Sequence, residues 1–335
     1  MVSIIDDISG EIMRVSIING GFSKQMKVLA GIHVLLLVLF FCGEFSQAAK
    51  LGNSLGLKTA PMPKYQAGTP YVYSDGSWET VIKVGPEGIT WRNHRGSIST
   101  GSPDFIYKRF KWQTKKRYGY RDFKQTTFIM SPPTPPLWPL EVGNKTRFDE
   151  KGRWFDELGV ESRYDSFWSC EVIGTEKVSV GAGDFDTWKI TCKRYPDKFR
   201  STSKTREYRT WYYAPIVNHW VVEDRDYNGY RENRSKELIA VLPDLQTFTA
   251  DENDILSIQK QFQNALEANQ IGDTNVWENF NQQLVIGVTP VKSFKHPNGG
   301  ICRQYLQLLA KEGLPYEFPG IACRNEKGRW VIPRR

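Results

Sequence analysis

The segment GGICRQYLQLLAKEGLPYEFPGIACRNEKGRW, residues 299–330, places two cysteines symmetrically about the dipeptide Glu312-Gly313. A two-residue turn at this dipeptide brings Cys302 and Cys323 directly opposite each other in an antiparallel hairpin. Counting outward from the residue pair that closes the turn puts both cysteines at a non-hydrogen-bonded position, where Cα atoms lie about 4.5 Å apart and a disulfide can join them. The segment therefore predicts a β-hairpin closed by a disulfide.

The same register divides the side chains of this hairpin between two faces, because successive strand residues point to opposite sides. Three apolar residues share the face of the cysteines, which we expect to be buried: Leu306, Leu308 and Ile321. The other face carries the candidate binding residues Arg303, Tyr305 and Arg324. Pro315 and Pro319 fall on non-hydrogen-bonded positions, so they fit this ladder and favour an edge position for their strand.

A second cysteine pair, Cys170 and Cys192, is centred on Gly181. This spacing predicts another hairpin, with a Gly-containing loop of about three to five residues. Structural zinc is the alternative, but neither cysteine pair has C-x-x-C spacing, and His219 and His296 have no partner at ligand spacing. We predict two hairpin disulfides, no metal and no cofactor. Each disulfide closes a loop of about 20 residues and should stabilise the fold by roughly 3 kcal/mol.

The N-terminal region has the charged, apolar and small-residue order of a secretory signal. An apolar run spans Val28 to Cys42, about 15 residues, which is shorter than the roughly 20 of a membrane-spanning helix. We predict an upstream extension and signal peptide over residues 1–48, with the start at Met26. A rival interpretation makes Cys42 the lipid-carrying first residue of a lipoprotein, although Phe41 stands where a lipobox has a small residue.

Cleavage leaves about 290 residues, which suggests two domains at about 100 to 200 residues each. Residues 49–68 are rich in Gly, Pro and Lys and are predicted to form a flexible lead-in. Residues 69–246 alternate short β-type runs with turn residues, which predicts an antiparallel β domain. Export also suits the even number of cysteines that remains, because disulfides form in oxidising compartments.

A composition change marks the second predicted domain, residues 249–335. The sequence TADENDILSIQKQFQNALEANQIG opens with Thr249 and Glu252 at capping-box spacing. A single apolar stripe then recurs at three and four residues, formed by Ile255, Ile258, Phe262 and Leu266. We predict a helix over residues 250–269, followed by an antiparallel sheet. The fold class is therefore mainly β, a β-rich α+β protein.

The chain has a formal net charge of +8, and its densest basic block is YKRFKWQTKKRYGYRDFK, residues 107–124. Alternation of apolar and basic residues in this block is typical of a half-buried antiparallel strand pair. The favoured interpretation is a solvated strand face. The functional alternative is a surface for an anionic envelope component such as a lipid head group or polysaccharide, with nucleic acid excluded by export. Its candidate binding residues are Lys111, Trp112, Lys115, Arg117 and Tyr118.

No catalytic signature is present: the chain has no H-E-x-x-H, no G-x-S-x-G and no phosphate-binding glycine loop. We therefore predict a protein that is not an enzyme. One alternative is an envelope hydrolase with a site around Asp184, Asp186 and His219. Another is a periplasmic lipid or lipoprotein carrier, which would need a large apolar cavity in the β domain.

The C-terminal third resembles a known family. VWENF at residues 276–280, IGVTP at 286–290 and the spaced elements GICRQY and GIACRNEKGRW are similar to the C-terminal domain of the 17 kDa surface antigen family of Gram-negative bacteria. The resemblance covers residues 277–332 and implies a small β domain of an envelope protein without known catalytic residues. The glycine-rich segment and lipobox of the family are absent from this chain, so outer-membrane anchoring is not implied.

The first domain more loosely resembles β-rich exported proteins of unknown function, through VYSDGSWETVIKV at residues 72–84 and TWYYAPIVNHWV at residues 210–221. Together these observations predict an exported, non-catalytic cell-envelope protein. Its expected role is binding or structural, in the periplasm or at the outer membrane.

Overall fold

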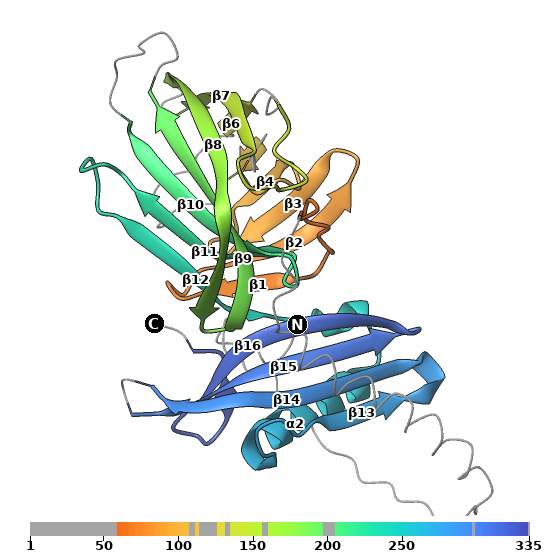
Figure 1. The fold of residues 1–335 in the computed structure, drawn as a ribbon. Coiled ribbons are helices and arrows are strands. Elements are labelled where there is room, and N and C mark those ends of the chain that lie inside the picture. Colours follow the sequence, from red (N-terminus) through yellow and green to blue (C-terminus); the bar gives the residue numbers. More distant parts are fainter. Residues whose placement is uncertain are drawn as a thin grey trace, which may run out of the picture. The chain divides into compact units, whose positions relative to one another are not determined.

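The computed structural model describes residues 59–106, 111–113, 126–130, 135–155, 160–196, 205–296 and 299–333 (Figure 1). Within these residues the protein is mainly β, with one α-helix and a C-terminal sheet, which confirms the predicted fold class. The predicted signal peptide, Cys42 and residues 49–58 lie outside the described residues. No described helix combines the length and the apolar character needed to cross a bilayer.

Twelve strands form a closed antiparallel ring. Each strand pairs with the next one in the chain, and β12 pairs back with β1, so that no strand of the ring lacks a second neighbour. The predicted antiparallel character of residues 69–246 is confirmed. The strands are β1 (Pro70–Tyr73), β2 (Trp78–Gly85), β3 (Gly88–Asn93), β4 (Ile98–Gly101), β5 (Lys111–Gln113), β6 (Thr126–Met130), β7 (Lys145–Phe155), β8 (Glu161–Val180), β9 (Gly183–Tyr195), β10 (Glu207–Ala214), β11 (His219–Asp226) and β12 (Arg234–Val241).

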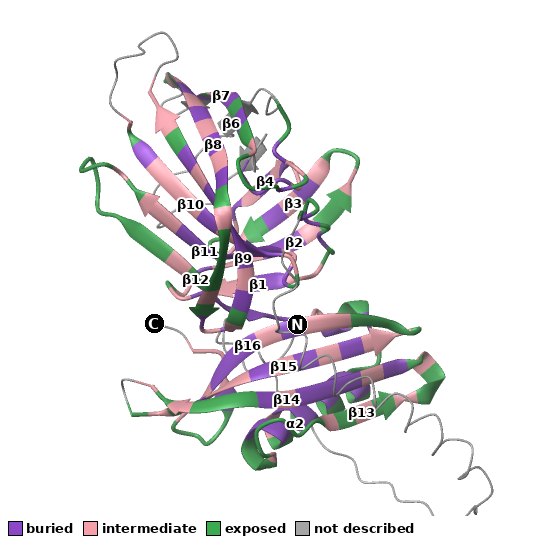
Figure 2. Cartoon of the chain, viewed as in Figure 1, coloured by how far each residue is buried: buried purple, intermediate pink, exposed green. Residues whose placement is uncertain are grey.

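The period of two along these strands decides which side chains are buried. On β9, Trp188, Ile190 and Cys192 are fully buried, whereas Lys189 and Lys193 between and beyond them are not. Figure 2 shows this banding along the ring. The segment at residues 59–68 also packs against the ring: Ala60 bridges to Leu140, and Tyr65 is buried.

The β8–β9 hairpin contains the predicted disulfide between Cys170 and Cys192, whose Cα atoms are 4.0 Å apart. Its turn differs from the prediction. Val180 pairs with Gly183, so the turn has two residues rather than three to five. A register shift between Val172 and Gly174 supplies the extra residue. A β-bulge thus accounts for the odd spacing that sequence alone attributed to the loop.

The C-terminal region contains the predicted helix and sheet. Helix α2 contacts β13, β14 and β17. The four apolar residues of the predicted stripe are all buried on it. The elements are η2 (Leu245–Thr247), α2 (Glu252–Ala268), β13 (Asn275–Asn279), η3 (Phe280–Gln282), β14 (Leu284–Lys295), β15 (Ile301–Lys311), β16 (Leu314–Arg324) and β17 (Trp330–Val331).

The start of α2 differs from the predicted capping box. The N-cap is Asp251, whose side chain accepts a hydrogen bond from the backbone N–H of Asn253. Thr249 instead donates its hydroxyl to Asp254 at 3.0 Å and accepts from the backbone N–H of Asp251. A capping box and an Asp N-cap both satisfy free amides of the first turn. This chain uses the contact from the Asp251 side chain to the N–H two residues later.

The β15–β16 hairpin confirms the predicted register. Lys311 pairs with Leu314, Cys302 pairs with Cys323, and the disulfide joins them. Glu312 and Gly313 have φ of 52° and 78°, the positive values that a two-residue hairpin turn of this hand requires.

The ring and the C-terminal sheet meet at a set of direct contacts. Ala240 of β12 pairs with Gly320 of β16. Gln304 donates its side-chain N–H to the backbone carbonyls of Val180 and Gly181, each at 3.2 Å. Ile239, Cys302 and Ile321 form a buried apolar cluster at this junction. The domain boundary predicted before residue 249 stays a prediction.

Substituting Gly320 by alanine tests this junction. A Cβ atom at residue 320 would lie 2.6 Å from the hydroxyl of Tyr305 and 3.0 Å from the Cβ of Ala240. Tyr305 is buried and cannot move freely. We expect G320A to lower the free energy of unfolding by about 1 to 3 kcal/mol through overpacking. Urea denaturation measures this, with G174A as the control because nothing lies within 4 Å of a Cβ there. Equal effects of the two substitutions would contradict the crowding argument.

Candidate functional site

The predicted cationic and aromatic surface lies mostly outside the described residues. Lys111 and Trp112 belong to the backbone of β5, which pairs with β4 and β6. Their side chains, and all of Lys115, Arg117 and Tyr118, are outside the described part of the chain. The pairing of β5 with β6 agrees with the predicted strand pair, and binding by these five residues stays a prediction.

The faces of the C-terminal hairpin differ from the prediction. Tyr305, expected on the open face, is buried against Phe262 of α2, with ring centroids 4.9 Å apart. Leu306 and Leu308, expected on the buried face, are only half-buried. The reason is that α2 covers the side of the sheet that Arg303, Tyr305 and Arg324 occupy.

The two arginines of that hairpin are engaged by the C-terminal end of α2 and its surroundings. Arg303 donates to the backbone carbonyl of Asn269 at 2.9 Å and lies over the ring of Trp330. Arg324 donates its Nε to Glu267 at 3.1 Å, and Trp330 donates to the same carboxylate. Their contacts tie the hairpin to the helix, and the Arg324 side chain remains 45% exposed. Binding by Arg303 and Arg324 stays a prediction.

The three residues of the hydrolase alternative occupy different environments. Asp184 is exposed at the start of β9, and Asp186 lies 3.9 Å from Lys177 in a solvent-exposed pair. His219 has no exposed surface. The structure therefore does not bring Asp184 or Asp186 together with the buried His219.

His219 lies in a cluster of aromatic rings. The hydroxyl of Tyr65 lies 2.9 Å from Nδ1, and the hydroxyl of Tyr73 lies 3.0 Å from Nε2. The ring of Tyr71 packs 4.2 Å from the imidazole centroid. Burial is the main cause that raises the pKa of Tyr65 and of Tyr73, so both phenols stay protonated. With both ring nitrogens hydrogen-bonded, His219 has the environment of a satisfied core histidine.

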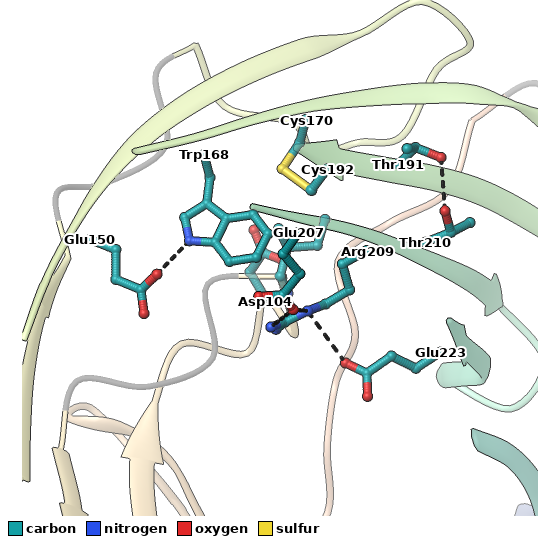
Figure 3. Close-up of a disulfide and its surroundings, with 11 residues drawn as sticks. Asp104, Glu150, Trp168, Cys170, Thr191, Cys192, Glu207, Arg209, Thr210 and Glu223 are labelled. Carbon is teal, nitrogen blue, oxygen red and sulfur yellow. Dashed lines mark hydrogen bonds and ion pairs between the residues drawn. A yellow bond between two sulfur atoms is a disulfide. The ribbon is translucent and has the colours of Figure 1, made fainter. Parts of the chain in front are cut away.

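A second buried cluster was not anticipated from the sequence. Six charged side chains on strands β7 to β11 form what we call the interior ion network, part of which is drawn in Figure 3: Glu150, Arg194, Glu207, Arg209, Glu223 and Arg225. Arg194 lies between Glu150 and Glu207, with N–O distances of 3.6 and 3.3 Å. Arg209 donates its Nε to Glu207 at 2.9 Å.

The other end of the interior ion network is the ion pair between Glu223 and Arg225. Arg225 donates one terminal nitrogen to both carboxylate oxygens of Glu223, each at 2.8 Å, and the Nε of Arg209 lies 4.0 Å from Glu223. Burial alone would raise the pKa of Glu223, but the charges of Arg225 and Arg209 outweigh it and lower that pKa below the usual 4.5. Glu223 is therefore ionised at neutral pH and is not a general acid.

Trp168 joins the interior ion network to the Cys170–Cys192 disulfide on the same strand (Figure 3). Its indole N–H donates to Glu150 at 2.6 Å. The guanidinium of Arg209 lies 4.9 Å from its ring centroid, within the range of a cation–π contact. Disulfide, indole and ion pairs thus form one continuous layer on the buried face of β8, β9 and β10.

The carboxylates of the network lie deeper than the arginines. The side chains of Glu207 and Glu223 are 3% and 7% exposed, whereas those of Arg194, Arg209 and Arg225 are 20 to 32% exposed. Three positive charges face three negative ones, so each buried charge has a partner. Arginine does not release its proton, and the carboxylates are held by ion pairs. The arrangement suits a structural role, with guanidinium edges as the accessible part.

Sequence contained a signal for this network. Glu207 and Arg209 in EYR, and Glu223 and Arg225 in EDR, are opposite charges two residues apart on strands, so each pair shares one face. This spacing permits a salt bridge within each pair but does not show that the pair is buried, because Glu161 and Arg163 have the same spacing and the Arg163 side chain is 76% exposed. No group of three or more potential metal ligands occurs in the part of the chain that the structure describes.

Comparison with known proteins concerns mainly the C-terminal region. Residues 264–331 match the model of the 17 kDa outer membrane surface antigen family, which confirms the resemblance predicted for residues 277–332. The 17 kDa surface antigen of Rickettsia bellii is 34% identical over 82 residues, which is 24% of this chain and 52% of that protein. The Rickettsia felis protein is 33% identical over the same shares. The chain thus spans about half the length of the curated relatives it matches.

Two solved structures are similar to a larger part of the chain. The hypothetical lipoprotein YmcC from Escherichia coli covers 64% of this chain with 97% of its own length, at 8% identity and a TM-score of 0.33. A protein with a YmcC-like fold from Bacteroides fragilis covers 55% with its full length, at 14% identity and a TM-score of 0.31. These scores are too low to carry a functional argument. The similarity to outer membrane surface antigens supports an envelope or exported location.

Proposed function

We propose that this protein is an exported, non-catalytic cell-envelope protein with a binding or structural role in the periplasm or at the outer membrane. The observation that carries the proposal is the match of residues 264–331 to the outer membrane surface antigen family. In this chain that region is a helix-covered sheet attached to a larger ring of strands. The ring is an addition on which the matched relatives give no information, so its role is part of the proposal.

Two disulfides support export. The disulfides Cys170–Cys192 and Cys302–Cys323 each join two paired strands. Cys170, Cys192 and Cys302 are buried. Structural disulfides persist in oxidising compartments such as the periplasm and are rare in the cytosol. The pairing therefore agrees with maturation outside the cytoplasm.

The placement of the titratable groups supports a non-catalytic role. His219 is held by two tyrosine hydroxyls, and Asp184 and Asp186 lie at a solvent-exposed turn. Glu223 is ionised and forms an ion pair with Arg225. A general acid or base needs access to a reacting group, and both His219 and Glu223 are buried.

Cell fractionation tests the location. Expressed with its own N-terminus in a Gram-negative host, the protein should appear in the periplasmic or outer-membrane fraction, with the N-terminus of the mature chain near Ala49. Non-reducing peptide mapping of the same material should give the two disulfides. Recovery in the cytoplasm with the N-terminal segment intact would refute the proposal. A blocked, acylated Cys42 would replace the soluble form by a lipid-anchored one.

The binding role can be tested on the basic segment that connects β5 and β6. Lys115 and Arg117 contribute two positive charges, and near an anionic lipid surface each charge is worth about 1 kcal/mol. The variant K115Q/R117Q should therefore bind anionic phospholipid vesicles with a dissociation constant raised roughly thirtyfold, and the difference should shrink at high salt. Vesicle cosedimentation measures both.

The matched control removes the same charge elsewhere. Lys177 and Lys189 are already paired with Asp186 and Glu176 on the outer face of the ring, so K177Q/K189Q should change vesicle binding little. An equal loss in both variants would show that net charge alone is responsible. Undiminished binding by K115Q/R117Q would remove the basic segment as a binding surface.

A further inference from the structure

Strand β13 is at the free margin of the C-terminal sheet (Figure 1). Among the described strands it pairs only with β14, through the register from Asn275 opposite Val288 to Asn279 opposite Leu284. The register contains no shift, so the strand is regular along its length. A regular strand at a sheet margin presents a row of backbone N–H and C=O groups to which another strand can bind.

The hairpin register identifies which groups point outward. Lys311 and Leu314 close the two-residue turn and exchange hydrogen bonds, so hydrogen-bonded positions alternate from there across β15 and β14. Carried to β13, this alternation directs the backbone groups of Asn275, Trp277 and Asn279 toward β14. The N–H and C=O groups of Val276 and Glu278 consequently face away from the sheet.

Strand β16, on the opposite side of the same sheet, differs from β13 in its outward backbone groups. In β16, the residues with outward backbone groups include Pro315 and Pro319, which have no N–H to donate. Prolines at these positions protect a strand edge against pairing. No proline, lysine, arginine or bulge occurs within β13. One edge of this sheet is therefore blocked, and the other is left competent to pair.

Exposed apolar side chains occur on β13 and in the segments immediately before and after it. Ile271, Val276 and Phe280 are 51%, 51% and 74% exposed, although they lie within ten residues of one another. Figure 2 shows the mixture of exposed and half-buried residues on β13. Covering Val276 together with the outward backbone groups of β13 would remove apolar surface from water, which favours association.

We propose that β13 pairs antiparallel with β13 of a second copy of this chain, forming a two-fold dimer with one continuous sheet. Centring the two-fold axis on Trp277 makes Val276 exchange hydrogen bonds with Glu278 of the partner subunit, and Glu278 with the partner's Val276, about four bonds in all. Glu278 then faces a valine instead of its own copy, so no like charges are opposed. A two-fold contact of this kind uses the same patch on both subunits.

Because the register assigns the N–H of Val276 to the dimer contact, removing that one backbone donor tests the dimer. Val276→Pro removes an N–H that faces outward and leaves the hydrogen bonds between β13 and β14 in place. Val276→Thr keeps the N–H and the branched Cβ and is the matched control. In sedimentation equilibrium of the exported chain, wild type and V276T should have twice the mass of the chain, and V276P should have the mass of one chain. A monomeric wild type, or a V276P variant that remains dimeric, overturns the proposal.

A cysteine scan tests the register without relying on the proline variant. At the two-fold axis, residue 277 lies opposite its own copy, with Cα atoms about 4.5 Å apart. Oxidised Trp277→Cys should therefore form a covalent dimer in high yield. Leu314→Cys, at a residue that is 61% exposed at the far turn, should not. Equal cross-linking of both variants, or cross-linking of neither, contradicts pairing through β13 and leaves the proposed envelope location unaffected.

Discussion

Replacing Glu223 by glutamine is expected to lower the free energy of unfolding by about 3 kcal/mol at neutral pH. The substitution keeps the shape of the side chain but leaves Arg225 and Arg209 without their shared carboxylate. Removing one partner of a buried ion pair costs about 3 to 5 kcal/mol, and the lower end applies because the arginines keep 20% and 32% exposure. Urea denaturation followed by tryptophan fluorescence measures the loss.

The pH dependence of this loss has a definite sign. The pKa of Glu223 is lowered in the folded protein, so its stabilising contribution is present above its unfolded value of 4.5 and disappears as the pH falls through the lower folded value. The difference between wild type and E223Q should therefore be full at neutral pH and vanish in acid. A difference that persists below that range would assign the loss to packing and not to charge.

The control for E223Q is an ion pair on the outer face. Lys189 and Glu176 lie 3.1 Å apart with 33% and 49% exposed side chains. Pairs of this kind contribute at most about 1 kcal/mol, so E176Q should change stability little. If E176Q and E223Q lose the same free energy, the interior ion network has no special weight in this fold.

Removing the Cys302–Cys323 disulfide is expected to cost about 3 kcal/mol as well. The bond closes a loop with a sequence separation of 21, and in the chain-entropy account a loop of this size destabilises the unfolded state by that amount. The double variant C302A/C323A should show the loss in urea denaturation. Because Cys302 packs with Ile239 of β12 and Ile321 of β16, the same variant should loosen the contact between ring and sheet.

The Cys170–Cys192 disulfide provides the comparison. Its sequence separation is 22, so the entropic contribution is nearly the same, but it joins two strands of the ring and not the junction. C170A/C192A should lose a similar free energy without increasing hydrogen exchange in β12 and β16. A loss below about 1 kcal/mol for either pair would mean that the loop-closure account fails for this protein.

Local patterns predicted a large part of this fold. The positions of two cysteines about Glu312-Gly313 predicted the β15–β16 hairpin residue by residue, because turn length and strand pairing leave one register. The apolar stripe from Ile255 to Leu266 predicted α2 within two residues at its start and one at its end. The bulge at residues 172–174 was missed, since an extra strand residue and an extra loop residue give the same cysteine spacing.

The candidate sites were harder to predict than the elements. Alternation in β15 correctly separated two faces, but sequence could not tell which face α2 would cover. The face of Arg303 and Tyr305 was therefore expected to be open, although α2 packs on it. The face containing Cys302 is buried only where the ring packs on it, and Leu306 and Leu308 beyond that contact remain half-exposed. Such an assignment depends on contacts between residues far apart in the chain.

By itself, the sequence determined the mainly β character, the helix, both disulfide pairings and the resemblance of the C-terminal region, because each follows from local periodicity or from spacing within one hairpin. Only the tertiary structure decided that β12 returns to β1, that Glu150, Arg194, Glu207 and Arg209 meet, and that β13 remains at a margin while β16 is joined to the ring. The physical reason is that ring closure and buried ion pairs depend on contacts between strands far apart in the chain, where pairing offsets the desolvation of the charges. No local pattern specifies which strands those are.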